Sequence, residues 1–422
     1  MNKHCYRIVF NPKRGILMAV FERARGQGKG SGGARTRSRL RLAGLLPFLF
    51  APVVQAQIVA NPNAPAHQQP VVTSAPNGVP LVNIQTPSAA GVSHNSYQRF
   101  DVQTPGAILN NSAGNTSTQL GGWVQGNPAL SGGEARVILN EVNASNPSQL
   151  RGFVEVAGGR AQVVIANPAG VTCDGCGFIN ASRATLTTGT PVVNDRGQLE
   201  GYRVQRGTVT ITGQGLDARS ADYTDILARA VDVQAALRAQ KLKIITGTQR
   251  VDLDSAGDPS PGQALAGEGD APAVGIDTAA LGGMYANQIT LIATEAGAGI
   301  RNAGQLYAGV GDVLITAAGE LQNQAGGRIV AQGDTRIRSQ QLTNRGLIDG
   351  KQTRIDTQRL TNTGTGKIYG DHLAIAAQTL TNSAEGGLAG TLAARMQLDL
   401  AVTWLDNTGH ALIYSGGNLS IG

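Results

Sequence analysis

Residues 163–188, VVIANPAGVTCDGCGFINASRATLTT, hold the features that decide the fold. The apolar run Val163–Ile165 predicts a buried strand. The segment Asn167-Pro168-Ala169-Gly170 predicts a tight turn, because proline fixes φ, glycine accepts positive φ, and asparagine can bond its own backbone. The residues after Gly177 return to aromatic and β-branched side chains, which favour another strand. The stretch therefore predicts short strands joined by tight turns.

The composition of the whole chain points the same way. Of its 422 residues 57 are glycine, while aromatic residues make up 4% and charged residues 15%, a balance that favours turn-rich β structure over a helical enzyme. Alternating runs at 135–142, 149–156 and 161–165 predict successive strands, and residues 255–275 predict a loop or insertion. Residues 222–241 carry helix-forming side chains with irregular apolar spacing, and we interpret them as β structure.

The formal net charge of +7 comes from the N-terminal segment. Residues 1–56 contain 11 Lys or Arg and one acidic residue, which leaves 24 basic and 27 acidic residues in 57–422, a net charge of −3. A nucleic-acid partner, which a basic chain would suggest, therefore loses its main support.

The N-terminal segment is typical of an export signal. Its basic region is followed by an apolar run at 40–54 that is too short and too interrupted to span a bilayer permanently. Val54-Gln55-Ala56 then forms a small-residue cleavage pattern. We predict cleavage between Ala56 and Gln57, and an exported mature chain.

Cys173 and Cys176 are the only cysteines beyond this cleavage site. A zinc site usually needs two such pairs, and a thioredoxin-like centre needs its CxxC at the start of a helix. In an exported chain a local disulfide is the simplest interpretation, and its small loop would contribute roughly 2 kcal/mol. Metal and redox roles stay open as alternatives.

The C-terminal part contains a repeat marked by aliphatic-x-Asn triplets. Successive asparagines are 21, 21, 18, 20 and 25 positions apart, and they are Asn302, Asn323, Asn344, Asn362, Asn382 and Asn407. A period near 20 with strand-like residues between the triplets predicts a β-solenoid. The asparagines would then stack in a ladder in which each amide bonds to the next coil.

Several of these motifs resemble two-partner-secretion exoproteins, which include filamentous haemagglutinin-type adhesins and contact-dependent growth-inhibition exoproteins. The turn at 167–171, the CDGC loop and the following Gly-Phe-Ile-Asn are similar to the secretion domain of that family. A second Asn-Pro turn at 127–130 also matches, although Ala129 and Ala169 stand where the family usually has asparagine. Residues 1–29 resemble its extended signal peptide.

The resemblance implies an all-β fold, a right-handed parallel β-helix (β-solenoid) with short extra-helical hairpins and an N-terminal cap. It implies an extended signal peptide at 1–56, a two-partner-secretion domain at 57–310 and haemagglutinin-type repeats at 311–422. The family associates both Asn-Pro turns with secretion, and a purely structural role for them stays open. The corresponding residues are Asn127, Pro128, Asn167, Pro168 and Gly170.

The implied function is that of an exoprotein region that targets the chain to a cognate outer-membrane transporter and nucleates an extracellular rod. Its partners would be the periplasmic POTRA domains of that transporter, the Sec machinery, and receptors on host or neighbouring cells. The rod would be monomeric, without nucleic acid, metal or cofactor. It would lie at the surface of a Gram-negative bacterium or in the medium.

The alternative is a polysaccharide lyase or glycosidase built on a β-helix. Such chemistry needs clustered carboxylates, or a base with calcium ligands, on one face. The acidic residues are dispersed, and no two repeats bring them to matching positions. We therefore favour a non-enzymatic protein, and the sequence does not separate an adhesin from a toxin carrier.

Overall fold

The computed structural model describes residues 6–11, 16–21 and 57–422, which belong to two separate units divided near residue 54. In the first unit, β1 (Tyr6–Asn11) and β2 (Ile16–Phe21) pair as an antiparallel hairpin. Ala56, on one side of the predicted cleavage site, lies outside the described residues. The described residues include no helix long and apolar enough to cross a bilayer.

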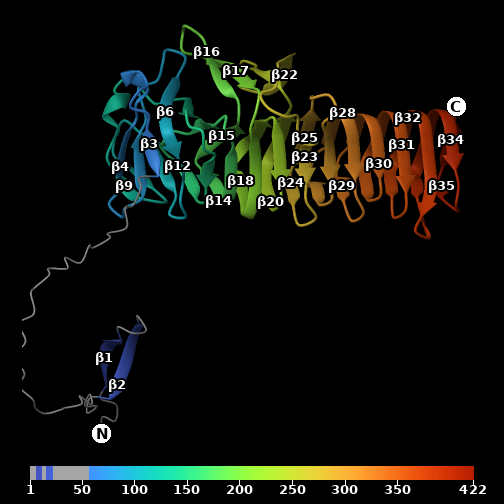
Figure 1. Ribbon diagram of the computed structural model, residues 1–422, viewed down its shortest axis with the longest axis horizontal. Coiled ribbons are helices and arrows are strands. Elements are labelled where there is room, and N and C mark those ends of the chain that lie inside the picture. Colours follow the sequence, from blue (N-terminus) through green and yellow to red (C-terminus); the bar gives the residue numbers. More distant parts are fainter. Residues whose placement is uncertain (1–5, 12–15, 22–56) are drawn as a thin grey trace, which may run out of the picture. The chain divides into compact units, whose positions relative to one another are not determined.

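The second unit is a parallel β-helix, as predicted (Figure 1). Most strands pair in parallel with the strand one coil earlier and one coil later, as β13 does with β10 and β15, whereas β3 and β4 at the N-terminal end pair antiparallel with β6 and β5. The strands of its first part are β3 (Ile58–Ala60), β4 (Val71–Ser74), β5 (Pro80–Asn83), β6 (Val92–Phe100), β7 (Ala107–Asn111), β10 (Val137–Val142), β11 (Ser148–Leu150), β12 (Phe153–Gly158), β13 (Ala161–Ala166), β14 (Val171–Ile179), β15 (Ala181–Thr187), β18 (Thr208–Ala228), β19 (Ala230–Val233) and β20 (Ala236–Thr246).

The later coils continue this stacking in register. Their strands are β23 (Val274–Thr278), β24 (Gly283–Ala286), β25 (Gln288–Ala293), β26 (Gly299–Asn302), β27 (Gln305–Ala308), β28 (Val313–Asn323), β29 (Arg328–Ala331), β30 (Thr335–Asn344), β31 (Leu347–Thr363), β32 (Lys367–Glu385), β33 (Leu388–Ala389), β34 (Thr391–Asn407), β35 (Leu412–Ser415) and β36 (Asn418–Ile421). Most pairings are parallel, and β33 folds back on β32 as a short antiparallel hairpin.

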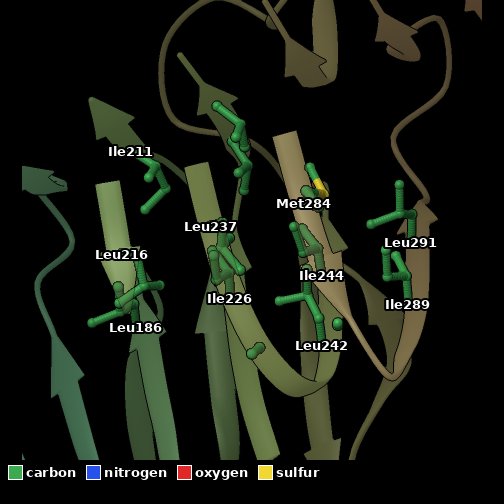
Figure 2. Packing of buried hydrophobic residues seen from close by; sticks show 14 of the residues in the cluster. Leu186, Ile211, Leu216, Ile226, Leu237, Leu242, Ile244, Met284, Ile289 and Leu291 are labelled. Carbon is green, nitrogen blue, oxygen red and sulfur yellow. The ribbon is translucent and has the colours of Figure 1, made fainter. Parts of the chain in front are cut away.

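The interior is filled by columns of aliphatic side chains. Ile315, Ile337, Ile355 and Ile375 are buried and lie opposite one another in consecutive strands of one sheet. Figure 2 shows the same packing further upstream, where Leu186, Leu216, Ile226, Leu242 and their neighbours point into the interior. Each such side chain contributes roughly 1.5–3 kcal/mol through burial. Stacked coils therefore share one continuous core.

Short elements outside the coils cover parts of the β-helix. They comprise the 3₁₀ turns η1 (Ala66–Gln68) and η2 (Pro128–Leu130), the hairpin β8 (Thr116–Thr118) with β9 (Gly122–Val124), and an antiparallel sheet of β16 (Thr190–Val193), β17 (Leu199–Val204), β21 (Gln249–Leu253) and β22 (Pro259–Ala264). That four-stranded sheet, here called the extra-helical sheet, packs Tyr202 and Val251 on Val164 and Leu227 of the coils. Its strands stand above the coils in Figure 1.

Three local predictions needed correction or were settled by the structure. Residues 222–241 are strands, as interpreted, because they pair in parallel with coils on both sides. The single strand expected at 149–156 is instead two, since the chain turns at Gly152, where a Cβ would lie 2.1 Å from the Gln103 carbonyl oxygen. The expected loop at 255–275 contributes β22 to the extra-helical sheet.

Candidate functional site

The first Asn-Pro turn is held by the side chain of Asn127, which is buried. Its Oδ1 accepts a hydrogen bond of 3.0 Å from the Ala129 amide and so caps η2. Its Nδ2 donates to the carbonyl oxygens of Ile84 at 2.8 Å and Asn110 at 3.0 Å. Pro128 occupies the first position of η2, where a missing N–H is harmless. One amide therefore fixes the turn and ties it to two other segments.

The second Asn-Pro turn, between β13 and β14, has a similar arrangement. Asn167 Oδ1 accepts from the Ala169 amide at 2.9 Å, and Nδ2 donates to Asn146 O and Ser148 Oγ, each at 3.0 Å. The Gly170 amide closes the turn on Asn167 O at 2.9 Å. Gly170 has a φ of +125°, and a Cβ there would lie 3.0 Å from the Thr208 carbonyl oxygen. Both the conformation and the close approach require glycine.

These geometries bear on how the turns could act. The asparagine side chains are buried and their polar atoms are engaged, whereas Pro128 is exposed and Ala129, Pro168 and Ala169 are partly exposed. The two turns share no hydrogen-bond partner and stay on separate parts of the coil stack. The asparagines are therefore placed to hold coils together, and a partner could touch only the outer rim of each turn.

Cys173 and Cys176 form a disulfide on the inner side of β14, where both side chains are buried. The register of β14 against β18 shifts between Asp174 and Cys176, so the disulfide spans a β-bulge. Gly175 has a φ of +81° within this bulge. Asp174 Oδ1 accepts from the Gln214 amide on the next coil at 3.0 Å. This arrangement leaves no sulfur at the surface for metal or redox chemistry.

The repeat asparagines form one continuous ladder. Asn302, Asn323, Asn344, Asn362 and Asn382 each donate from Nδ2 to the Oδ1 of the next asparagine, ending at Asn407, and every one of these bonds is 2.8 Å long. The first five of these side chains are buried. Backbone carbonyls of nearby glycines accept further bonds from the same amides, as Gly366 does from Asn362. The ladder joins successive coils along one corner.

The structure also contains a buried charge pair that the sequence did not reveal. Arg183 donates to Asp225 at 2.6 Å, and both side chains are at most 6% exposed. Asp258, in the turn that joins β21 and β22 of the extra-helical sheet, lies 3.7 Å from Arg183. Burial raises the pKa of Asp225 to about 6, although the Arg183 charge opposes that rise. The two residues are 42 positions apart, so no local pattern could have paired them. Their position ties the extra-helical sheet to the coils.

No cluster of three or more His, Cys, Asp or Glu side chains suited to holding a metal occurs among residues 57–422 and the two short N-terminal strands.

Residues 1–51 match a family described as the extended signal peptide of the type V secretion system. Residues 56–323, well over half of the chain, match the family of TPS secretion domains, where TPS denotes two-partner secretion.

The chain belongs to the TPS secretion domain family. A solved structure of the filamentous hemagglutinin secretion domain supports this with a TM-score of 0.56 and 33% sequence identity, covering 76% of this chain and 97% of that one. The TPS secretion domain of this chain thus has the same fold as the solved domain. The predicted family and the predicted β-helix are both confirmed.

This TPS chain is similar to two curated relatives that carry the name CdiA. It is 48% identical over 364 residues to the Toxin CdiA of Yersinia pestis, which covers 83% of this chain and 11% of the relative. It is 42% identical over 347 residues to the tRNA nuclease CdiA-2 of Burkholderia pseudomallei, which covers 79% of this chain and 11% of the relative. The chain therefore spans about a tenth of the length of these relatives. It is a secreted exoprotein region displayed at the surface of a Gram-negative bacterium.

Proposed function

We propose that this chain directs its own export through a cognate outer-membrane transporter and then nucleates an extracellular β-helix. In this proposal residues 1–56 are the extended signal peptide used by the Sec machinery and removed after Ala56. Residues 57–310 engage the periplasmic POTRA domains of the transporter. Residues 311–422 form repeat coils that extend the rod.

The observation that carries the proposal is the unbroken register between the secretion region and the repeats. β25 pairs with β28 and β28 pairs with β30, each in parallel, so the division near residue 310 interrupts no strand pairing. A folded secretion domain therefore presents a ready strand edge and an open core to the next coil. Each added coil buries apolar surface against the last, a nearest-neighbour gain typical of repeat proteins. Such growth would favour outward movement without nucleotide hydrolysis.

The secretion motifs have a specific part in this proposal. Asn127, Pro128, Asn167, Pro168 and Gly170 build two turns whose amides clamp adjacent segments during the first steps of folding. The disulfide between Cys173 and Cys176 closes a four-residue loop, which is small enough to pass a pore with the unfolded chain. The motifs would then act by making the first coils form promptly at the cell surface.

The rod itself would be monomeric and non-enzymatic, and would present more distal segments to receptors on host or neighbouring cells. The matched family is a secretion domain, and the nuclease activities named for relatives belong to those proteins. Adhesion and toxin delivery both fit this role.

The test is export of the chain with and without its neighbouring transporter. We expect transporter-dependent release of a protease-resistant, β-rich product whose N-terminal residue is Gln57. Asn167→Ala should reduce release severalfold, while Asn418→Ala, at an exposed asparagine without a side-chain hydrogen bond among the described residues, should not. Release without the transporter, or equal release of both variants, would contradict the proposal.

A further inference from the structure

One sheet of the β-helix is covered on its outer face only in the early coils. There the extra-helical sheet packs over Leu139, Val164 and Leu227. Further along, the same face carries Leu314 and Thr316 on β28, and it is no longer covered by any element that the structure describes. Figure 1 shows β28 and β30 beyond the end of the extra-helical strands. The uncovered face is therefore a surface with its own side-chain chemistry.

Three arginines gather on this face in consecutive coils. The strand register places Arg336 opposite Leu314 and Arg354, and places Arg338 between Thr316 and Asp356. These residues line an open hollow of about 620 Å³, which we call the arginine groove. Gln352 lies at its side. Each strand adds a further position along the β-helix axis, about 4.8 Å apart.

Much of the hydrogen-bonding capacity of these arginines is unused. Arg354 is exposed and forms no hydrogen bond or ion pair with any residue that the structure describes. Arg338 is 75% exposed and lies 3.7 Å from Asp356, too far for a hydrogen bond. Arg336 donates to Asp334 at 2.8 Å with one of its nitrogens. Since residues 57–422 carry a net charge of −3, this groove is a local positive surface on an acidic body.

We propose that the arginine groove binds an extended polysaccharide containing uronic acids. A guanidinium group presents a planar pair of donors that matches a carboxylate. The coil spacing is comparable to the length of one sugar ring, so arginines on β30 and β31 can meet carboxylates along one polysaccharide strand. Thr316 and Gln352 supply hydroxyl and amide groups for the sugar hydroxyls.

Charge density favours uronates over sulfated polymers. The charges of Arg336, Arg338 and Arg354 are offset by Asp356 in the groove and by Asp334, which is bonded to Arg336, so one net positive charge is left over three strands. This low density suits a polymer with at most one charge per sugar. Several sulfates per repeating unit would face Asp356, whose side chain is 50% exposed.

Nucleic acids fit the groove less well. Single-stranded nucleic acids bind by stacking bases on aromatic rings, and the residues that line the groove include no aromatic side chain. Tyr223, an aromatic residue of an earlier coil, already has Arg183 4.4 Å and Lys241 5.0 Å from its ring centre. Duplex DNA is usually read by a helix or ribbon that enters a groove, and this surface is a sheet face.

The experiment is a binding titration of the secreted chain with polygalacturonate oligosaccharides, compared with neutral dextran, dextran sulfate and a thymidine oligonucleotide. We expect saturable binding to polygalacturonate and none to neutral dextran. The triple variant R336A/R338A/R354A should lower that affinity by at least roughly tenfold. The control R328A/R359A/K367A removes the same charge from exposed positions outside the groove and should change it less than about twofold.

A second variant separates loss of binding from loss of fold. D356N removes the acidic residue from the groove and should raise affinity for polygalacturonate severalfold, an effect that misfolding cannot produce. Equal effects of the two triple variants would overturn the site. Absence of polygalacturonate binding, or tighter groove-dependent binding to dextran sulfate or the oligonucleotide, would overturn the proposed ligand.

Discussion

Replacement of Asn344 by alanine tests whether the asparagine ladder holds the coils together. Asn344 is buried in the middle of the ladder, where it accepts from Asn323 and donates to Asn362, each at 2.8 Å. It also exchanges bonds with Gly346 and donates to the carbonyl oxygen of Lys367. Alanine removes all of these groups at once and leaves the surrounding backbone unchanged.

The expected cost follows from what the substitution leaves unpaired. Asn362 Oδ1 is buried and has no other donor among the described residues, so losing its partner costs about 1–3 kcal/mol. Asn323 Nδ2 keeps weaker bonds to Gly327 O and Leu347 O, so the loss there is smaller. The lost bonds to Gly346 add about 1 kcal/mol. The sum is roughly 2–4 kcal/mol.

Two further variants supply the comparison. Asn407→Ala removes a ladder member that is exposed, so water replaces its bonds and the cost should stay below about 1 kcal/mol. Thr343→Ala, next to Asn344, removes one bond to Glu320 and should cost about 1 kcal/mol or less.

The measurement combines denaturant unfolding with hydrogen exchange, because repeat proteins can unfold locally and depart from two-state behaviour. We expect Asn344→Ala to increase exchange in β30 and β31 (335–344 and 347–363) first. If all three variants destabilise these strands equally, the ladder does not act as a set of buried, mutually satisfied amides.

Further predictions concern single positions. Gly366→Ala places a Cβ 2.5 Å from both Asn344 O and Asn362 Oδ1 and should destabilise the fold by about 2–4 kcal/mol. Gly114→Ala, in open space, should shift the melting temperature little, and a similar shift for both variants would contradict the steric account. Thr278 lies opposite Asn302 in the adjacent strand, so Thr278→Asn should give the unpaired Asn302 Oδ1 a donor and stabilise the chain by about 1 kcal/mol in denaturant titration. If Thr278→Val gives the same gain, the stabilisation does not come from a ladder bond. Burial raises the pKa of Asp225 from 3.8 to about 6, so the folded state holds this proton more tightly, and up to about 3 kcal/mol of stability should be lost as pH rises from 4 through 6. Asp225→Asn should remove that component of the pH–stability profile, and superimposable profiles would refute it.

The repeats were predictable from sequence because one constraint recurs at each turn. A buried asparagine needs the same residue one coil later, so the positions from Asn302 to Asn407 mark the coils directly. The Asn-Pro turns were visible for a similar reason, since proline, glycine and asparagine each encode local backbone geometry. Short motifs of neighbouring residues were therefore enough to predict the turns and the coils.

The extra-helical sheet was not predictable in the same way. β17 pairs with β21 across more than 40 intervening residues, and strand character alone names no partner. The segment 222–241 was ambiguous because helix propensity and strand pairing compete there, and parallel neighbours on both sides decide the outcome. The Arg183–Asp225 pair and the arginine groove likewise depend on which strands become neighbours. These contacts arise only when coils are stacked in register.

The asparagine ladder also has a direction. Each asparagine from Asn302 to Asn382 donates to the next one toward the C-terminus, and each interior member also accepts from the one before it, so the local dipoles align and reinforce each other along the corner. An interior member needs both a donor and an acceptor, whereas the last member needs only an oxygen. Aspartate could therefore terminate such a ladder but could not continue it. A growing rod with this polarity presents an N–H donor at its advancing corner, and the arriving coil is selected by its ability to offer an acceptor there.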